Sequence, residues 1–215
     1  MSSSSPLSGL DRLIAVCQHH SLPLELSPPL ASAPKPGELV LGEPFDPQLA
    51  AAYQRLGTAE LGPLTLYGPH SKEQGLLSRN EWLRQHDWVH IRSMLIFGKK
   101  TGYAYYCGTV PRLASSQGLQ PVVYIDCHET LYAVPIASSV DRFFDLYSRY
   151  LELLVAAPGY GQSGAMLITF PWGMTPLIAR DEPLMEQVLA GGFDLLADNH
   201  RDALEWLQQL RTARF

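Results

Sequence analysis

Two shortages in this 215-residue sequence, of cysteine and of cationic side chains, narrow the classes of protein to which it can belong. Its three cysteines, Cys17, Cys107 and Cys127, are too few for a disulfide framework and too scattered for a zinc site of four thiolates. Sixteen lysines and arginines stand against 21 aspartates and glutamates, which gives a net charge of −5. A general nucleic-acid binder needs a cationic face to displace counterions, so nucleic acid is not an expected partner.

The sequence also lacks a segment suited to crossing a membrane. No residue from Leu153 to Ala179 is charged, but Pro158, Pro171 and Pro176 interrupt this stretch. A spanning helix needs about 20 mainly apolar residues with a continuous hydrogen-bond ladder. The opening residues, MSSSSPLSGL, contain neither the cationic stretch nor the apolar segment of a secretory signal. We therefore expect a cytoplasmic protein without a membrane partner.

Familiar catalytic and nucleotide-binding motifs are missing as well. The chain holds no G-x-S-x-G, P-loop or paired-cysteine motif. Gly159, Gly161 and Gly164 match the dinucleotide fingerprint G-x-G-x-x-G, which works only where a strand enters the turn and a helix leaves it. Here a predicted helix enters the turn, so we interpret the glycines as a linker and expect no nucleotide cofactor.

Histidine spacing does not predict a metal site. His86 and His90 are four residues apart and could ligate one ion from a helix, with Asp87 nearby. The apolar residues around them favour the start of a strand, which would separate the two rings. We expect no bound metal.

One short string, Asp126-Cys127-His128-Glu129, has the composition of a catalytic site. On a strand Cys127 and His128 point to opposite faces and cannot pair as nucleophile and base, so Cys127 is predicted to be a small core residue. Asp126 and His128 can share the other face and form a polar spot. We interpret the string as a solvated turn and assign no catalytic residue.

What is present is enough apolar sequence for a packed core, since 46% of the residues are hydrophobic and 17% are charged. Apolar residues at helical spacing predict helices over about 9–19, 47–56, 139–157, 182–190 and from 200 onward. The predicted N-caps are Ser8, Asp46, Ser138 and Asn199. Asp11 and Asp141 are the predicted capping-box partners of Ser8 and Ser138.

Runs of β-forming residues predict a sheet in the middle of the chain. The predicted strands are Leu64–Tyr67, Val89–Phe97, Tyr103–Val110, Val122–Cys127, Leu131–Pro135 and, later, residues 165–170. The connectors GKKTG, SSQG and HET are short enough for hairpins, which favours an antiparallel meander. We expect an α/β (α+β) fold in which helices pack on an antiparallel or mixed sheet.

The chain is expected to have two parts. Residues 1–158 would form the α/β domain, in which residues 21–45 hold six prolines and predict an extended, irregular segment. Residues 159–215 would form a mostly helical extension. Its apolar residues, including Trp206, could not bury themselves in so short a segment, so we expect it to pack on the domain.

The sequence resembles the SUKH superfamily, which includes a fungal regulator of glucan synthesis. Three strings carry the resemblance, LGTAELGPLTLYGP, IFGKKTGYAYYCGTV and QPVVYIDCHETLYAVPIASSVDRFFDLY, and it covers about residues 8–157. Lys99 and Lys100 depart from the acidic or small polar residues expected at the central turn. The end of the chain, FDLLADNHRDALEWLQQL, is similar to an extension of longer members. The resemblance implies an α/β fold and, for bacterial members, immunity proteins that bind and neutralise toxins.

The expected function is therefore to bind a protein toxin in the cytoplasm. Residues 121–215 hold six basic and twelve acidic residues, which favours a basic partner, although acidity also keeps proteins soluble. The predicted partner-binding residues are Lys99, Lys100, Tyr103, Tyr105, Asp126, His128 and Glu129. Two alternatives stay open: a regulatory or scaffold module with an endogenous protein partner, and a small-molecule enzyme that uses the Asp126/His128/Glu129 turn with Tyr103 or Tyr105.

Overall fold

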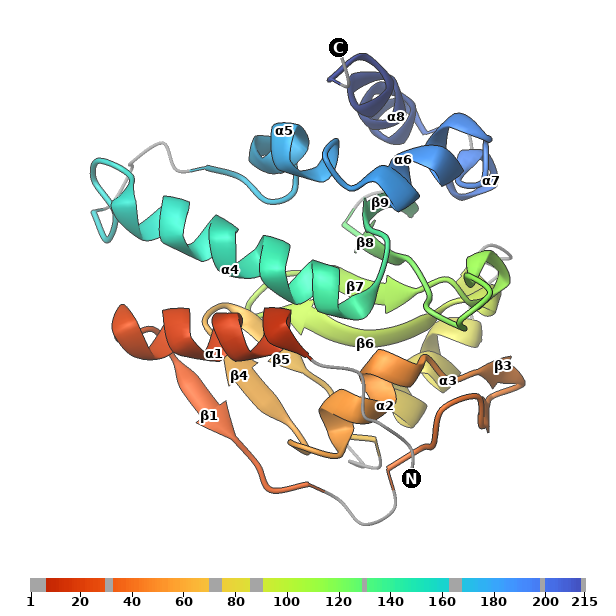
Figure 1. Ribbon diagram of the computed structural model, residues 1–215, viewed down its shortest axis with the longest axis horizontal. Helices are drawn as coiled ribbons and strands as arrows, with labels where there is room; N and C mark the ends of the chain where they lie inside the picture. Colours follow the sequence, from red (N-terminus) through yellow and green to blue (C-terminus); the bar gives the residue numbers. More distant parts are fainter. Residues whose placement is uncertain are drawn as a thin grey trace.

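A seven-stranded antiparallel sheet forms the centre of the protein, seen in a computed structural model that describes residues 7–29, 33–69, 75–85, 91–128, 131–162, 168–197 and 200–213 (Figure 1). The strands, in their order across the sheet, are β1 (Leu24–Leu26), β4 (Ala59–Leu61), β5 (Leu64–Leu66), β6 (Leu95–Lys100), β7 (Tyr105–Thr109), β8 (Val122–Asp126) and β9 (Tyr132–Ala137). The strands β2 (Leu39–Val40) and β3 (Glu43–Pro44) pair separately. From β4 to β9 each strand pairs with the next along the chain, which confirms the predicted meander.

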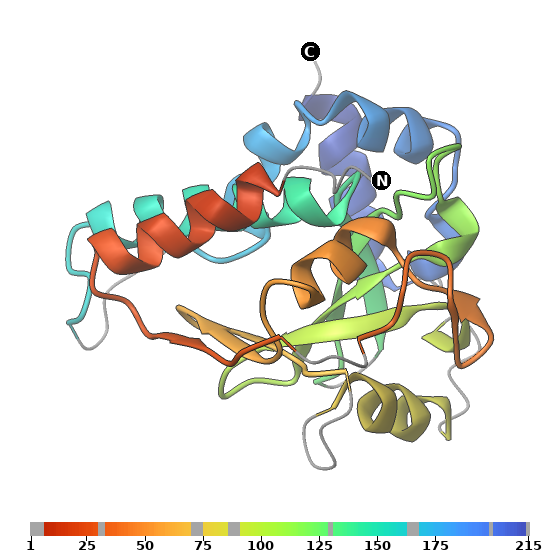
Figure 2. The ribbon, with the colours of Figure 1, turned by 60° about the horizontal axis from the view of Figure 1, so that its bottom comes forward.

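Helices cover both faces of this sheet. They are α1 (Ser8–His19), α2 (Pro47–Tyr53), α3 (Leu76–Arg84), α4 (Val140–Ala156), α5 (Thr175–Ile178), α6 (Glu182–Leu189), α7 (Asp194–Ala197) and α8 (Arg201–Ala213), with short 3-10 turns η1 (Ile91–Ser93), η2 (Pro111–Leu113) and η3 (Trp172–Met174). Helices α1 and α4 lie side by side over one face, and Figure 2 shows α3 on the opposite face. No helix in the described ranges is long and apolar enough to cross a membrane. The predicted α+β class is confirmed.

Helix α4 sits on the sheet because its apolar residues recur at helical spacing. Phe143, Phe144, Tyr147 and Leu151 are all buried, and Phe143 meets Phe97 of β6 with ring centroids 5.7 Å apart. The start of helix α1 lies very close to α4. A Cβ added to Gly9 would come within 2.0 Å of the backbone oxygen of Asp141, so only glycine allows this approach.

The helix caps follow the sequence prediction in one case and depart from it by one residue in two others. Asp46 caps α2 as predicted, because its carboxylate accepts the N–H groups of Gln48 and Leu49, each at 2.8 Å. Ser8 does not cap α1, which starts after Leu7 without a side-chain cap. The cap of α4 is Ser139 and not Ser138, and its hydroxyl accepts the N–H of Arg142.

A contact between α1 and α4 takes the place of the predicted cap of α1. The carboxylate of Asp141, predicted to complete a capping box in its own helix, instead accepts the N–H groups of Gly9 at 2.8 Å and Leu10 at 3.3 Å. The Ser8 hydroxyl also donates to this carboxylate. Asp141 therefore satisfies the exposed amides at the start of α1, and a local sequence motif cannot show that.

Several strand predictions also need correction. The proline-rich segment 21–45 includes the short strands β1, β2 and β3, and β4 was not predicted, since strands of two or three residues leave almost no periodic pattern. Strand β6 begins at Leu95 and follows the turn η1, while residues 86–90, with His86 and His90, lie outside the described residues. No strand occupies residues 168–170, where Phe170 packs among aromatic rings and precedes Pro171, which lacks an N–H for a ladder.

The residues after position 168 pack against the last strand of the sheet. Helices α6, α7 and α8 all contact β9. Trp206 of α8 is fully buried, and its indole N–H donates to the backbone oxygen of Pro135 at 3.0 Å. Leu207 and Leu210 of the same helix are buried, whereas Leu204 is 46% exposed. The predicted cap Asn199 lies outside the described residues.

Candidate functional site

Two tyrosines and a lysine form a cluster at the surface where the turn after β6 leads into β7. The turn requires a positive φ, which Gly102 supplies at +80°. Tyr103 is 55% exposed, and its ring stacks on that of Tyr105 with centroids 5.6 Å apart and planes 9° from parallel. The Lys100 ammonium lies 4.5 Å from the centroid of Tyr103 and 5.8 Å from that of Tyr105. Lys100, Tyr103 and Tyr105 are called the tyrosine–lysine cluster below.

The Lys100 ammonium interacts mainly with the faces of the Tyr103 and Tyr105 rings. Desolvation lowers the pKa of this half-buried lysine. Among the residues that the structure describes, no carboxylate forms an ion pair with Lys100. A cation over tyrosine faces is attracted by the ring quadrupoles, so the three side chains are mutually ordered. The cluster therefore presents the exposed ring of Tyr103 to solvent, beside the partly buried Lys100 and Tyr105.

Asp126 and His128 lie beside this cluster, at the end of β8. Asp126 is the register partner of Tyr105, and the His128 ring lies 6.3 Å from the Tyr105 ring. The Asp126 carboxylate accepts the His128 backbone N–H at 2.8 Å and the Tyr132 hydroxyl at 3.2 Å. Asp126 thus holds the turn closed, as an Asx turn does, rather than orienting the His128 ring as a base.

Cys127 does not join these polar groups. It is partly buried and packs against the core, and desolvation raises the pKa of its thiol to about 12, followed by a smaller effect of the Asp126 charge. A thiol with so high a pKa is protonated at neutral pH and is a poor nucleophile.

Lys99, another predicted partner-binding residue, does not extend the cluster. Lys99 pairs with Tyr106, whose ring contacts Arg79 of α3, so strand alternation places Lys99 on the α3 face. Lys100 and Tyr105 face α4. Lys99 is therefore on the other face of the sheet from Lys100 and Tyr105. Glu129 lies outside the described residues.

Packed aromatic rings support the cluster from below. Tyr105 contacts Tyr124 of β8 at 5.3 Å between centroids, and Phe170 contacts both Tyr147 and Tyr150 of α4 at 5.2 Å. The space that these rings enclose with Lys100 is about 10 Å³, room for at most one water molecule. The cluster rests on a filled aromatic floor and is not the mouth of a ligand cavity.

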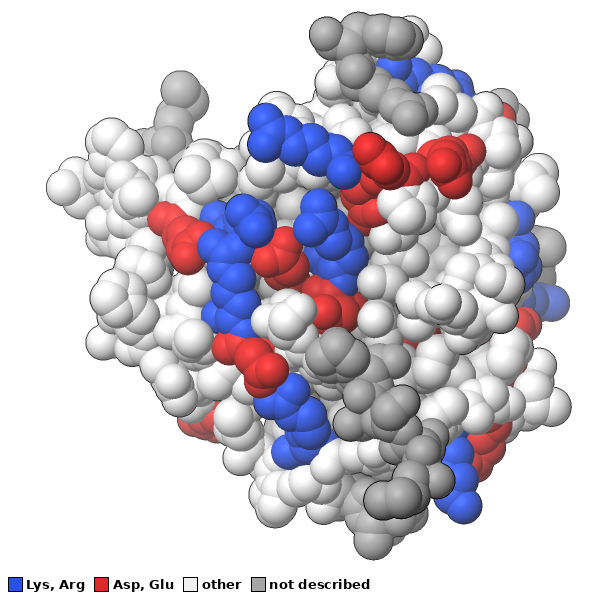
Figure 3. Space-filling view, in the orientation of Figure 1, with Lys and Arg blue, Asp and Glu red and all other residues white. Residues whose placement is uncertain are grey.

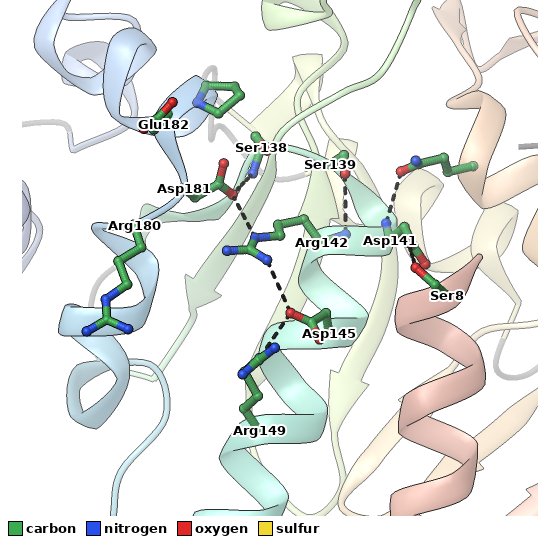
Figure 4. A pocket seen from close by; sticks show the side chains of 12 residues that line it. Ser8, Ser138, Ser139, Asp141, Arg142, Asp145, Arg149, Arg180, Asp181 and Glu182 are labelled. Carbon is green, nitrogen blue, oxygen red and sulfur yellow. Dashed lines mark hydrogen bonds and ion pairs between the residues drawn. The ribbon is translucent and has the colours of Figure 1, made fainter. Parts of the chain in front are cut away.

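A separate polar cleft lies at the start of α4, on the face shown in Figure 3. It has a volume of about 670 Å³ and is open to solvent. Its lining residues are Ser8, Gln48, Ser138, Ser139, Asp141, Arg142, Asp145, Arg149, Arg180, Asp181, Glu182 and Pro183 (Figure 4). We call it the arginine cleft after Arg142, Arg149 and Arg180.

One carboxylate in this cleft holds several guanidinium groups. Asp145 accepts hydrogen bonds from Arg12 at 3.0 Å, Arg142 at 3.2 Å and Arg149 at 3.1 Å. Desolvation alone would raise the pKa of Asp145, but the bonds from Arg149 and Arg12 outweigh it and lower that pKa. Asp145 is therefore ionised at neutral pH and orders the arginines around it (Figure 4).

Sequence reasoning missed the arginine cleft. The spacing of Arg142, Asp145 and Arg149 along α4 could have shown an ion-paired helix face, but Arg180 and Asp181 come from a distant segment. Within the described ranges, no group of three His, Cys, Asp or Glu residues is arranged to hold a metal ion.

Comparison with known proteins identifies no relative of this chain: no protein-family model matches it, and no curated protein matches it. The candidate sites therefore rest on their own geometry.

Proposed function

We propose that this protein binds another protein through the tyrosine–lysine cluster. The observation that carries the proposal is the exposure of Tyr103, which stacks on Tyr105 and lies beside Lys100, a lysine without an ion-pair partner among the described residues. Tyrosine is enriched at tight interfaces because it buries a large area and loses little conformational entropy. Here the aromatic floor already orders the rings, so a partner would meet a preformed surface.

The partner that we propose is a protein toxin, which makes this chain an immunity protein. The resemblance of residues 8–157 to the SUKH superfamily supports this choice. The acidic excess of residues 121–215 favours a basic toxin and would speed the encounter of the two proteins. A chain that acts on a toxin inside its own cell would be cytoplasmic.

The proposal can be tested by affinity capture from cells that also carry the gene encoded beside this one, which would encode the toxin. Calorimetric titration of the captured protein then measures its affinity. Tyr103→Ala should weaken binding by at least about tenfold, because a central aromatic contact contributes about 1–2 kcal/mol or more. Leu195→Ala is the control, since Leu195 is 65% exposed on α7 and lies away from the cluster. Equal affinity of Tyr103→Ala and the unaltered chain would place the interface elsewhere. Capture of an endogenous regulatory protein instead of a toxin would contradict the immunity role.

A further inference from the structure

The arginine cleft holds more hydrogen-bond donors than its own side chains use. Each guanidinium carries five N–H groups. Within the described residues, Arg149 donates only from Nε to Asp145, and Arg142 donates from Nη1 to Asp145 with its Nε 3.9 Å from Asp181. The Arg180 guanidinium forms no hydrogen bond or ion pair with any residue in the described part of the chain.

Two of the carboxylates that line the cleft are engaged by backbone amides. Asp141 accepts the N–H groups of Gly9 and Leu10 at the start of α1. Asp181 accepts the N–H of Ser138 at 2.8 Å and that of Leu184, in the first turn of α6, at 3.4 Å. Their charges are therefore offset by the positive ends of two helices, and that of Asp181 also by Arg142.

Four carboxylates and three guanidinium groups line the cleft, so what it offers to an anion is unused N–H donors and not a net positive charge. Asp145 is shared with Arg12, which lies outside the cleft, and Glu182 is exposed to solvent. Ser139 adds a further donor, because its oxygen accepts the N–H of Arg142 while its own O–H is free to turn into the cleft. Figure 4 shows Arg180 across the cleft from Arg142 and Arg149.

We propose that the arginine cleft binds the phosphate group of a small molecule, between Arg142, Arg149 and Arg180. Guanidinium groups bind phosphate oxygens through paired N–H donors, and the first turn of a long helix such as α4 adds a favourable dipole. A volume of about 670 Å³ exceeds the size of one phosphate ion and falls within the range of small-molecule sites, so we infer a phosphate ester as the ligand. This site is separate from the tyrosine–lysine cluster and does not depend on the proposed protein partner.

Nuclear magnetic resonance titration of the full chain tests this site. Inorganic phosphate and phenyl phosphate are the probes, citrate is the polycarboxylate comparison, and chloride holds ionic strength constant. We expect saturable shifts of the Ser139, Arg142 and Asp181 amides with both phosphates. Tighter binding of phenyl phosphate supports an ester as the ligand, and equal binding supports free phosphate in the same site.

Charge-removing variants separate this site from general anion attraction. Arg180→Gln and Arg149→Gln should each weaken phosphate binding at least tenfold, and Arg180→Gln removes no bond that the described structure shows. Arg201→Gln is the matched control, because this exposed arginine of α8 pairs with Glu205 outside the cleft. Equal weakening in all three variants, or shifts no larger than those with chloride, would overturn the proposal. Saturation by citrate without saturation by either phosphate would also overturn it.

Discussion

Lys99 and Lys100 are adjacent on β6, but only Lys100 lies in the tyrosine–lysine cluster. Lys100 faces α4 and lies over the rings of Tyr103 and Tyr105, whereas Lys99 pairs with Tyr106 and faces α3. Both lysines occupy the same turn in the sequence and were predicted to bind together. The two faces of a strand separate them because side chains alternate at every residue.

The pair of lysines therefore provides a matched test of the interface. Lys100→Met keeps the aliphatic length of the side chain and removes its charge, so we expect partner binding to weaken by about 1–2 kcal/mol, as for a desolvated cation over aromatic rings. Lys99→Met should change affinity by less than about 0.5 kcal/mol. Calorimetric titration of both variants with the captured partner checks this, and a larger loss in Lys99→Met would assign the interface to the α3 face.

At the scale of the element, Asp46 joins the start of α2 to a distant loop. This fully buried carboxylate accepts the N–H groups of Gln48 and Leu49 in its own helix and that of Gln120, at 2.8 Å, from the segment before β8. Desolvation raises the pKa of Asp46 to about 6, although its three backbone hydrogen bonds act in the opposite direction.

This shift predicts a pH dependence of stability with a definite sign. Because the folded-state pKa lies above the ordinary value of about 3.9, folded Asp46 keeps its proton longer than unfolded Asp46 as pH rises. The stability due to Asp46 is greatest below about pH 4 and declines between about pH 4 and 6, by up to about 3 kcal/mol.

Asp46→Asn isolates this contribution, since asparagine can still cap the helix but does not titrate. Urea unfolding at pH 4 and pH 7 should show the unaltered chain losing about 1–3 kcal/mol relative to Asp46→Asn over this interval. A constant difference between the two proteins, or one that grows in favour of the unaltered chain, would contradict the raised pKa.

The elements also show what a sequence can predict. Asp46, Pro47 and the apolar spacing after them lie within one turn, so the start of α2 was correct to the residue. The caps of α1 and α4 were both predicted one residue away, and at the start of α1 the amides are satisfied by Asp141 of another helix. The edge strand β1 has three residues held by pairing with β4, a contact that no local pattern encodes.

At the scale of the whole molecule, the pairing of β6 with β7 and of β8 with β9 could be predicted because short connectors join these strands, but the arginine cleft could not. Its arginines come from α4 and from the segment before α6, and only the packing of that segment beside α4 brings Arg180 near Arg142. Sites assembled from distant segments leave no spacing signal in the sequence. The three residues of the tyrosine–lysine cluster, in contrast, lie on one hairpin, so their closeness along the chain allowed the sequence to predict them together.

Aromatic contacts run from that hairpin to the last helix. Tyr105 contacts Tyr124, Tyr124 contacts Trp172 at 5.6 Å, and Trp172 contacts Trp206 at 5.9 Å between ring centroids. Trp206 in turn donates to Pro135 of β9. The C-terminal helices therefore share a hydrophobic core with the sheet, and they support the floor beneath the tyrosine–lysine cluster.

Replacing Trp206 should consequently destabilise the sheet as well as α8. Trp206→Ala removes a fully buried indole and its hydrogen bond, and a change of this kind costs about 3–5 kcal/mol. Leu204→Ala, on the exposed side of the same helix, should cost less than about 1 kcal/mol and is the control. Urea unfolding followed by circular dichroism and by tyrosine fluorescence should show one transition in each variant, shifted to lower urea in Trp206→Ala. If the loss in Trp206→Ala were confined to a separate early transition, with the main transition unmoved, the C-terminal helices would be an independent unit and their support of the cluster would be refuted.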